Sequence, residues 1–253
     1  MAKTRSARLK AKQTRSAQHV CSAHRALKRQ LIDAGKVLVA EGQDDFTRGH
    51  ISFRVPDAPS LFFMKAHSIG LDEITMQNIL TIDLEGNVVS GSARRHSEVY
   101  IHSEIFKARP DVNCVIHTHP AFSIALSATG RPLKCYSQSG ALFYEALGSY
   151  ADTINLIRTQ AMGAGVARAL GRGYAVLLKN HGVVVAGATV EEAVIRLIML
   201  ENGARVQLLA EAAGDPVPEF SRADIEKLKA DISQPEQFKI NFDYLVRRVK
   251  RRG

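Results

Sequence analysis

The sequence lacks the features that mark several classes of protein. It holds only three cysteines in 253 residues and no Cys-x-x-Cys pair, so we expect a reduced protein without a disulfide framework. No apolar run approaches the ~20 residues that would span a bilayer. No apolar core follows the charges of the first twenty residues, which argues against a secretory signal. These absences predict a cytoplasmic protein with no membrane association.

The sequence also has few acidic residues where its basic residues gather, with none in residues 3–15 and one, Asp243, in residues 242–253. The net charge is +9, with six Lys or Arg in residues 3–15 and five in residues 242–253. Basic ends can attract nucleic acid or acidic partners. However, no aromatic residues alternate with these charges, and there is no nucleic-acid-binding motif. Solvated ends are therefore the favoured interpretation, and nucleic acid binding is the alternative.

The chain has the composition of a globular protein, with 45% hydrophobic and 23% charged residues and no internal repeats. Its length suits one domain with a sizeable core. We predict a basic flexible extension over residues 1–16 and the main domain over residues 17–215. We expect residues 216–253 to be helical and to pack on the domain or on a neighbouring subunit.

Hydrophobic periodicity and turn signals predict an alternation of strands and helices. The predicted helices cover residues 17–42, 97–108 with Ser97 as N-cap, 121–128, 151–173 and 190–213. The predicted strands cover residues 50–55, 60–66, two within 79–91, 112–119, and a pair within 174–187 around Asn180-His181-Gly182. This order predicts an α/β protein, a single α/β/α domain whose central, mostly antiparallel sheet is flanked by helices.

Three histidines give the strongest chemical signal. His117 and His119 are two residues apart on a predicted strand, so their side chains point to the same face. His181 lies at the tip between two apolar strands, and Gly182 after it permits an unusual turn and a close backbone approach. Three imidazoles suit zinc, iron, nickel or manganese, and a catalytic metal keeps a position open for substrate. Unrelated surface histidines are the alternative.

Glu98 and His102 are the next candidates. A carboxylate in the first turn of a helix interacts well with the helix dipole, so Glu98 could be a cap. It could equally be a general base or an extra ligand beside the metal, and the pattern alone leaves both open. His102 lies one turn further along the same face, where it either packs in the interior or supports the site.

The order of these segments resembles the class II aldolase/adducin family. The matching stretches are GHISFR (49–54), HSEVYIHSEIFKARPDVNCVIHTHP (96–120) and LLKNHGVVVAGATVEEA (177–193). The resemblance extends over residues 25–212. It implies a single α/β/α domain around a mostly antiparallel sheet, and a homotetramer with active sites at the subunit boundaries.

The resemblance also implies roles for individual residues. By it, His117, His119 and His181 are the metal ligands, and Glu98 is the acid/base residue that can also reach the metal. Tyr244 corresponds to the family's C-terminal tyrosine that closes over the site. The implied cofactor is one divalent ion per subunit, and zinc, manganese and iron(II) all fit this ligand set.

The sequence departs from the sugar-phosphate aldolases and epimerases of that family. Those enzymes hold the substrate phosphate with a Gly-Asn turn, a Thr-Gly pair and a Ser-Ser pair, whose small groups form a cradle. The corresponding pairs in this sequence are Gly49-His50, His67-Ser68 and His96-Ser97. Because three imidazoles replace small groups, we do not expect the usual phosphate cradle. A pocket of His50, His67 and His96 suits a carboxylate, a phenol oxygen or a flat ring.

This pattern looks like the decarboxylase branch of the family, which acts on hydroxylated aromatic or pyridine carboxylates. We therefore expect a metal-dependent carbon–carbon lyase, most simply a decarboxylase, whose metal holds a ring hydroxyl and a neighbouring carboxylate oxygen. Glu98 or a pocket histidine would protonate the ring carbon. Arg48 or Lys65 could bind a second carboxylate, although an exposed ion pair is the alternative for each.

Two other functions are compatible with the family. One is an aldolase or epimerase that acts on an unphosphorylated hydroxycarbonyl compound, which differs by releasing an aldehyde instead of carbon dioxide. The other is a non-catalytic binding module like the adducin head. Such a module does not need metal ligands, so the presence of all three histidines together with Glu98 argues against it.

Overall fold

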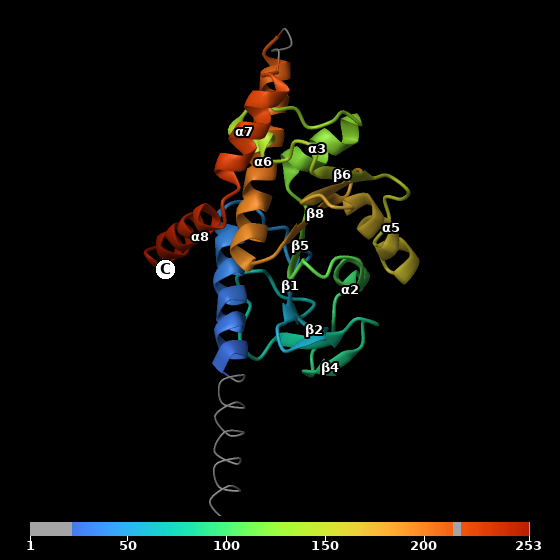
Figure 1. Ribbon diagram of the computed structural model, residues 1–253. Helices are drawn as coiled ribbons and strands as arrows, with labels where there is room; N and C mark the ends of the chain where they lie inside the picture. The colour runs from blue at the N-terminus through green and yellow to red at the C-terminus, as the bar shows by residue number, and fades with distance from the viewer. Residues whose placement is uncertain (1–21, 215–218, 253) are drawn as a thin grey trace, which may run out of the picture.

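A sheet of eight strands runs through the centre of the molecule between two layers of helices (Figure 1). The computed structural model describes residues 22–214 and 219–252, so the predicted extension over residues 1–16 lies outside the described residues. The strands are β1 (His50–Val55), β2 (Ala58–Lys65), β3 (Ile79–Asp83), β4 (Val88–Ser90), β5 (Cys114–Thr118), β6 (Leu147–Tyr150), β7 (Ala175–Leu178) and β8 (Gly182–Gly187). Their order in the sheet is β4-β3-β2-β1-β5-β8-β7-β6, and every neighbouring pair except β6–β7 is antiparallel. The α/β/α fold predicted from the sequence is confirmed.

Helices cover both faces of this sheet. An N-terminal helix is described over residues 22–40. The others are α2 (Val99–Ala108), α3 (Ala121–Thr129), α4 (Gln138–Ala141), α5 (Gln160–Leu170), α6 (Val190–Ala212), α7 (Arg222–Ile232) and α8 (Pro235–Lys250). Figure 1 shows α2 and α5 on one side of the sheet, and the N-terminal helix and α6 on the other. None of the helices in the described ranges combines the length and apolar character that a membrane span requires.

Alternation along the strands supplies two apolar cores, one for each face. Val115 and Val184 point to the side of α2 and α5, where they join Ile101 and Ile105. Their sequence neighbours point the other way, toward the N-terminal helix, α6 and α8. Central strands buried on both faces explain why β8 is apolar throughout instead of alternating.

Two local predictions were wrong. Ser97 is not the N-cap of α2, because that position belongs to Glu98, whose side chain makes no capping hydrogen bond. The helix predicted over residues 151–173 is formed only between Gln160 and Leu170. Residues 151–159 form a loop, in which the Thr153 hydroxyl accepts a hydrogen bond from the Asn155 backbone. Short polar side chains of this kind compete with helical hydrogen bonds, and the apolar periodicity did not reveal that competition.

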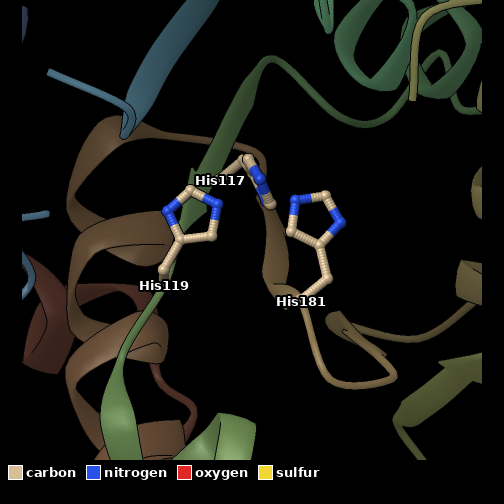
Figure 2. A group of neighbouring side chains, drawn as sticks. All are labelled: His117, His119 and His181. Atoms are coloured by element: carbon tan, nitrogen blue, oxygen red, sulfur yellow. The ribbon is translucent and has the colours of Figure 1, made fainter. Parts of the chain in front are cut away.

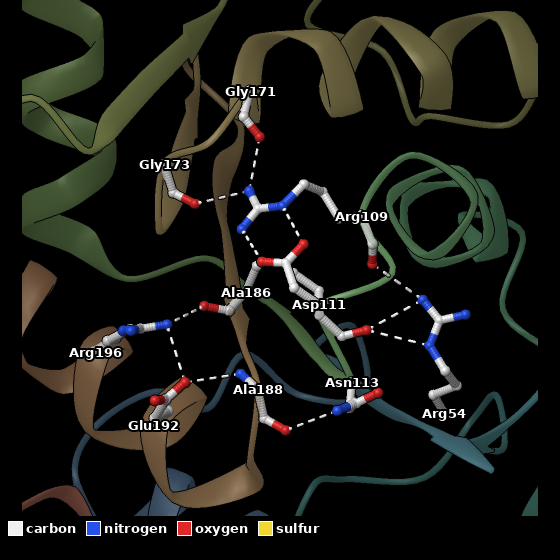
Figure 3. Close-up of polar contacts among 11 residues, drawn as sticks. Arg54, Arg109, Asp111, Asn113, Gly171, Gly173, Ala186, Ala188, Glu192 and Arg196 are labelled. Carbon is white, nitrogen blue, oxygen red and sulfur yellow. Dashed lines mark hydrogen bonds and ion pairs between the residues drawn. The ribbon is translucent and has the colours of Figure 1, made fainter. Parts of the chain in front are cut away.

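A buried arginine joins β1 to the end of α2 (Figure 3). Arg54 Nη2 donates to the carbonyls of Phe106 at 2.8 Å and Arg109 at 3.1 Å, and Nε donates to that of Val112 at 3.2 Å. Nη1 donates to the Pro59 carbonyl at 2.9 Å. The last carbonyls of a helix have no partner within it, so the guanidinium group satisfies orphaned acceptors that face its positive charge.

Candidate active site

The sheet register brings together histidines that are far apart in the sequence. His50 on β1 lies directly opposite His117 on β5. His119 follows the end of β5. His181 lies in the turn between β7 and β8, and β8 pairs with β5. Antiparallel pairing of the three central strands β1, β5 and β8 therefore places four imidazole rings together near the ends of these strands.

His117, His119 and His181 surround a common space (Figure 2). Each offers a ring nitrogen, and these three atoms lie within 4.8 Å of one another. The ring centroids of His117 and His119 are 4.6 Å apart, and that of His181 lies 5.1 Å from His117 and 5.3 Å from His119. The predicted ligand set is thus close enough to share one ion.

The surroundings of two of the three rings indicate which nitrogen each offers. His117 Nδ1 donates to the Val183 carbonyl at 2.8 Å, which leaves Nε2 bare in the neutral ring. His119 Nδ1 lies 3.0 Å from Asp45 Oδ2, which favours the same tautomer. Among the described residues, the buried Nε2 atoms of His117 and His181 have no hydrogen-bond partner. Buried, unpartnered acceptors that converge on one space fit a divalent cation.

The three rings are held in the neutral form that a metal requires. Burial lowers the pKa of His117, His119 and His181 below the ordinary histidine value, while the nearby Glu98 carboxylate acts in the opposite direction. A histidine must be unprotonated at the nitrogen that binds a metal. Burial therefore prepares the site for a cation near neutral pH.

The turn that carries His181 depends on two small departures from regular backbone. Asn180 has a φ of 58°, and asparagine tolerates this left-handed conformation better than most residues. A Cβ on Gly182 would lie 2.5 Å from the Thr118 carbonyl oxygen and 2.9 Å from His119 Cδ2. The close approach predicted at Gly182 is confirmed, but Asn180 supplies the unusual turn.

Glu98 faces the histidines and does not cap its helix. Its Oε1 accepts a hydrogen bond from the Ile157 backbone at 2.9 Å and lies 3.7 Å from His181 Nε2. Its Oε2 lies 3.8 Å from Nε2 of both His117 and His50. The carboxylate is buried beside the metal-ligand candidates. Glu98 occupies the N-cap position of α2 without a capping hydrogen bond, and its place beside the histidines favours the second role that the sequence left open.

A row of further imidazoles extends from His117 through His50 and His96 to His67. The ring centroids along it are 4.9, 4.6 and 5.1 Å apart. His96 Nε2 donates to the Ala66 carbonyl at 3.1 Å, and burial lowers its pKa to about 3. His67 Nδ1 is 2.6 Å from the hydroxyl of Ser68. These rings present neutral hydrogen-bonding groups instead of positive charge.

A cavity of about 500 Å³ opens onto this site. It is lined by Asp45, Thr47, Arg48, His67, His96, Ser97, Glu98, His119, Ile124, Ile154, Leu156, Asn180 and His181. Its polar groups gather around the histidines, whereas Ile154 and Leu156 of the 151–159 loop contribute apolar surface. Such a volume is within the usual range for small-molecule sites.

Arg48 forms an exposed ion pair, as expected, whereas the surroundings of Lys65 and Tyr244 differ from expectation. Arg48 pairs with Asp45 at 2.6 Å and also lines the cavity. Lys65 is buried instead of exposed, donates to the carbonyls of Thr47 and Ile69, and has its pKa lowered to about 8 by burial. Tyr244 lies on α8, half exposed, and is not among the described residues that line the cavity. Within one chain the fold does not bring Tyr244 to the site, because α8 packs against α6.

Sequence reasoning missed Asp45 and the 151–159 loop. Asp45 follows Asp44 in a polar stretch with no periodic pattern, so only its place five residues before His50 could have drawn attention to it. The loop was concealed by the prediction of a continuous helix. Ile157, whose backbone holds Glu98, belongs to that loop.

Comparisons with known proteins identify the family of this site. A sequence profile of the class II aldolase and adducin N-terminal domain matches residues 29–208. The chain belongs to the class II aldolase/adducin family. In structure it is similar to an L-fuculose 1-phosphate aldolase from Glaciozyma antarctica PI12, with a TM-score of 0.83, 27% identity, and coverage of 92% of this chain and 91% of that one.

The class II aldolase/adducin relatives of this chain include decarboxylases. It is 33% identical to decarboxylase NovR of Streptomyces niveus over 68% of this chain and 64% of that one. It is 28% identical to 3,4-dihydroxyphthalate decarboxylase of Arthrobacter keyseri over 81% of this chain and 87% of that one. Together with the family match, these relatives support a lyase. Class II aldolases generally depend on a divalent metal, and the His/Glu cluster of this chain is a possible site for one.

Proposed function

We propose that this protein is a metal-dependent decarboxylase of a hydroxylated aromatic or pyridine carboxylic acid. The observation that carries the proposal is the meeting of three neutral imidazoles and one buried carboxylate at the end of a cavity that His67 and His96 also line. The decarboxylases among its relatives support the same reaction class.

His117, His119 and His181 would hold the ion through ring nitrogens, with Glu98 beside them. A divalent ion at that place would act as a Lewis acid toward substrate oxygens. The ligand set does not select among zinc, manganese and iron(II), because imidazole suits each of them. Asp45 would keep the His119 ring oriented by accepting from its Nδ1 hydrogen.

Glu98 is the proposed proton donor. When the bond between the ring carbon and the carboxylate breaks, carbon dioxide leaves and the electron pair remains on the ring carbon. The Glu98 carboxylate would take the proton of the substrate hydroxyl as the substrate binds and give it to that carbon, and solvent would return a proton to the ring oxygen when the product leaves. The Ile157 backbone N–H holds the other carboxylate oxygen in place.

The rest of the cavity would select a flat, hydroxylated substrate. His96 donates its Nε2 hydrogen to Ala66, so its neutral ring has only Nδ1 left, as an acceptor. An acceptor suits a ring hydroxyl better than it suits a phosphate or a second carboxylate. Ile124, Ile154 and Leu156 offer apolar surface for an aromatic ring. His50, His67, Ser68 and Ser97 remain proposed contributors to this pocket.

The oligomer predicted from the family completes the proposal. Ile154 is 63% exposed and Leu156 is 37% exposed at the cavity, where a neighbouring subunit could cover them. We propose a homotetramer in which Tyr244 reaches the site of a neighbouring subunit. Small-molecule turnover, without nucleic acid, is the expected activity.

A screen of paired carboxylate isomers tests the reaction. Aromatic and pyridine carboxylates with a hydroxyl on the carbon adjacent to the carboxylate-bearing carbon should release carbon dioxide when zinc, manganese or iron(II) is supplied. Isomers with a distant hydroxyl should react far more slowly, since only the adjacent hydroxyl allows two oxygens to reach one ion. Equal rates for both isomers would contradict the proposed mode of binding.

An aldolase or epimerase acting on an unphosphorylated hydroxycarbonyl compound is the second candidate. It is favoured by the overall similarity to an L-fuculose 1-phosphate aldolase. Release of an aldehyde without carbon dioxide would establish it in place of the decarboxylase. Efficient turnover of a sugar phosphate would contradict the argument from the missing cradle in both cases.

A further inference from the structure

A chain of hydrogen bonds leads from Ser52 in the interior through His102 to His50, whose ring lies beside Glu98. The Ser52 hydroxyl on β1 is 2.6 Å from His102 Nδ1 on α2, and His102 Nε2 is 2.6 Å from His50 Nδ1. His50 Nε2 then faces Glu98 Oε2 at 3.8 Å. The side chains of Ser52, His102 and His50 are fully buried.

Two imidazoles in series can be hydrogen-bonded in either of two directions. A neutral imidazole has one donor nitrogen and one acceptor nitrogen, so the direction at one end of the chain dictates the direction at the other. Both rings are fully buried, and burial disfavours the charged form of an imidazole, so each ring carries a single hydrogen. Whichever direction the chain adopts therefore decides whether His50 Nε2 is a donor or an acceptor.

The Ser52 end favours one direction. If His102 Nδ1 carried the hydrogen, Ser52 Oγ would accept it, and the serine hydroxyl hydrogen would need another acceptor. The described residues offer Ser52 only one side-chain hydrogen bond, the one to His102. Burying a hydroxyl donor without a partner is costly. The hydroxyl should therefore donate to His102 Nδ1, which places the hydrogen of His102 on Nε2.

The Glu98 end independently favours the same direction. With the hydrogen of His102 on Nε2, His50 Nδ1 accepts it and His50 Nε2 carries a hydrogen of its own. That N–H faces a buried carboxylate oxygen at 3.8 Å. In the reverse direction a bare nitrogen would face the carboxylate, which would put two buried acceptors next to each other. Hydrogen-bond donors directed at a carboxylate stabilise it, and a bare nitrogen does not.

We propose that Ser52 and His102 are positioning residues that make His50 Nε2 a fixed hydrogen-bond donor, directed at Glu98 and at a substrate oxygen beside it. The inference deepens the proposed function and relies on it for the role of Glu98.

The position of the hydrogen on His50 also decides between two groups of residues that could bind the metal ion. His50, Glu98 and His117 are close enough to bind an ion, as are His117, His119 and His181. A protonated Nε2 cannot bind a metal, so the ion belongs to the second group.

The tautomer of His50 can be measured without any assay of activity. Magic-angle-spinning NMR of zinc-loaded protein labelled with ¹⁵N-histidine separates protonated from bare ring nitrogens, and a His50→Gln sample assigns the His50 signals. We expect a protonated Nε2 and a bare Nδ1 at His50. A bare Nε2 in the wild-type protein would overturn the proposal, whatever the enzyme's substrate proves to be.

Ser52→Ala removes the hydroxyl that sets the direction. Neither direction then satisfies His102 Nδ1, and only the Glu98 end still favours one of them, so we expect part of the His50 Nε2 signal to move from the protonated to the bare position. With a substrate found in the isomer screen, kcat should fall about tenfold while KM changes less than about twofold, which is the range seen when partners of catalytic groups are removed. Ser52→Thr restores a hydroxyl and should recover most of the loss.

Ser103→Ala is the matched control, because Ser103 is an equally buried serine next to His102 whose hydroxyl has no hydrogen-bond partner among the described residues. It should leave the His50 spectrum and kcat unchanged. If Ser52→Ala behaved like Ser103→Ala in the spectrum, the positioning role would be refuted. A protonated Nε2 in a protein that turned over no carboxylate would instead refute the proposed function and leave the hydrogen-bond chain intact.

Discussion

The two buried polar regions of this molecule treat hydrogen bonding in opposite ways. Around Arg54, each of the three guanidinium nitrogens donates to at least one backbone carbonyl, and α2 is joined to β1 (Figure 3). Around His117, buried nitrogens of three histidines lack a partner among the described residues (Figure 2). A satisfied polar network stabilises a fold, whereas an unsatisfied one costs stability and is retained where a ligand completes it. The contrast separates the part of the chain that holds the structure from the part that binds.

Removing one candidate metal ligand should have the largest effect of all, because bound metal and activity should both be lost. His117→Ala or His181→Ala should abolish bound metal and activity while the fold is retained, because the Nε2 atom of each ring has no hydrogen-bond partner among the described residues. Metal analysis by mass spectrometry, with circular dichroism for the fold, measures both. His24→Ala, which alters a histidine paired with Asp57 far from the cluster, should keep its metal. Full metal content in either ligand variant would refute the assignment.

Replacing the carboxylate should separate binding from chemistry. Glu98→Gln keeps the shape of the side chain but cannot exchange a proton near neutral pH, so we expect metal to remain and kcat to fall about 10²–10⁴-fold. Glu104→Gln, on the same helix, changes a carboxylate that pairs with Lys107 and should leave kcat nearly unchanged. A Glu98→Gln enzyme with near wild-type turnover would show that Glu98 has no part in proton transfer.

Disrupting the satisfied network around Arg54 should lower the stability of the fold and leave metal binding unchanged. Arg54→Met leaves several buried carbonyls without donors, and we expect the free energy of unfolding to fall by about 3 kcal/mol. Metal bound per folded chain should stay constant, since Arg54 contacts none of the candidate ligands. Chemical denaturation and metal analysis test the two halves of this statement. Arg168→Met, on the exposed surface of α5, should change the free energy of unfolding little. An equal loss of stability in the Arg54 and Arg168 variants would mean that the Arg54 network does not stabilise the fold.

The smallest expected effect concerns Asp45, which lies beside the candidate ligand His119. Asp45→Asn weakens the partner of His119 Nδ1, so the metal affinity should fall about 10–100-fold. The neighbouring Asp44→Asn makes the same change of charge at an exposed position and controls for long-range electrostatics. Competition with a chelator measures both affinities. Equal affinities in the two variants would show that Asp45 does not orient the ring.

Much of the fold and of the candidate site could be predicted from local pattern. Alternation identified the strand over residues 50–55, and the two-residue spacing placed His117 and His119 on one face. The apolar strands on either side of Asn180 and His181 identified the turn between β7 and β8. These features depend on residues close together in the sequence, where side-chain direction follows directly from backbone periodicity.

The predictions that failed depended on contacts between distant segments. The capping role of Ser97 and the helix over residues 151–159 were reasonable from local propensity, but the structure uses Ser97 in the cavity lining and the loop as a support for Glu98. The burial of Lys65 was equally invisible, because only the packing around β2 encloses it. Tertiary packing overrides local preferences of about 1 kcal/mol without difficulty.

The sequence by itself determined the class of fold and the strand and turn that carry the three histidines. Only the tertiary structure decided that His50 lies opposite His117 and that Glu98 points toward the candidate metal ligands. It also decided that Ser52, His102 and His50 are hydrogen-bonded in series. The physical reason is that periodicity fixes the face on which a side chain lies. The register between strands, and the partner that a buried nitrogen finds, are set by packing the whole chain.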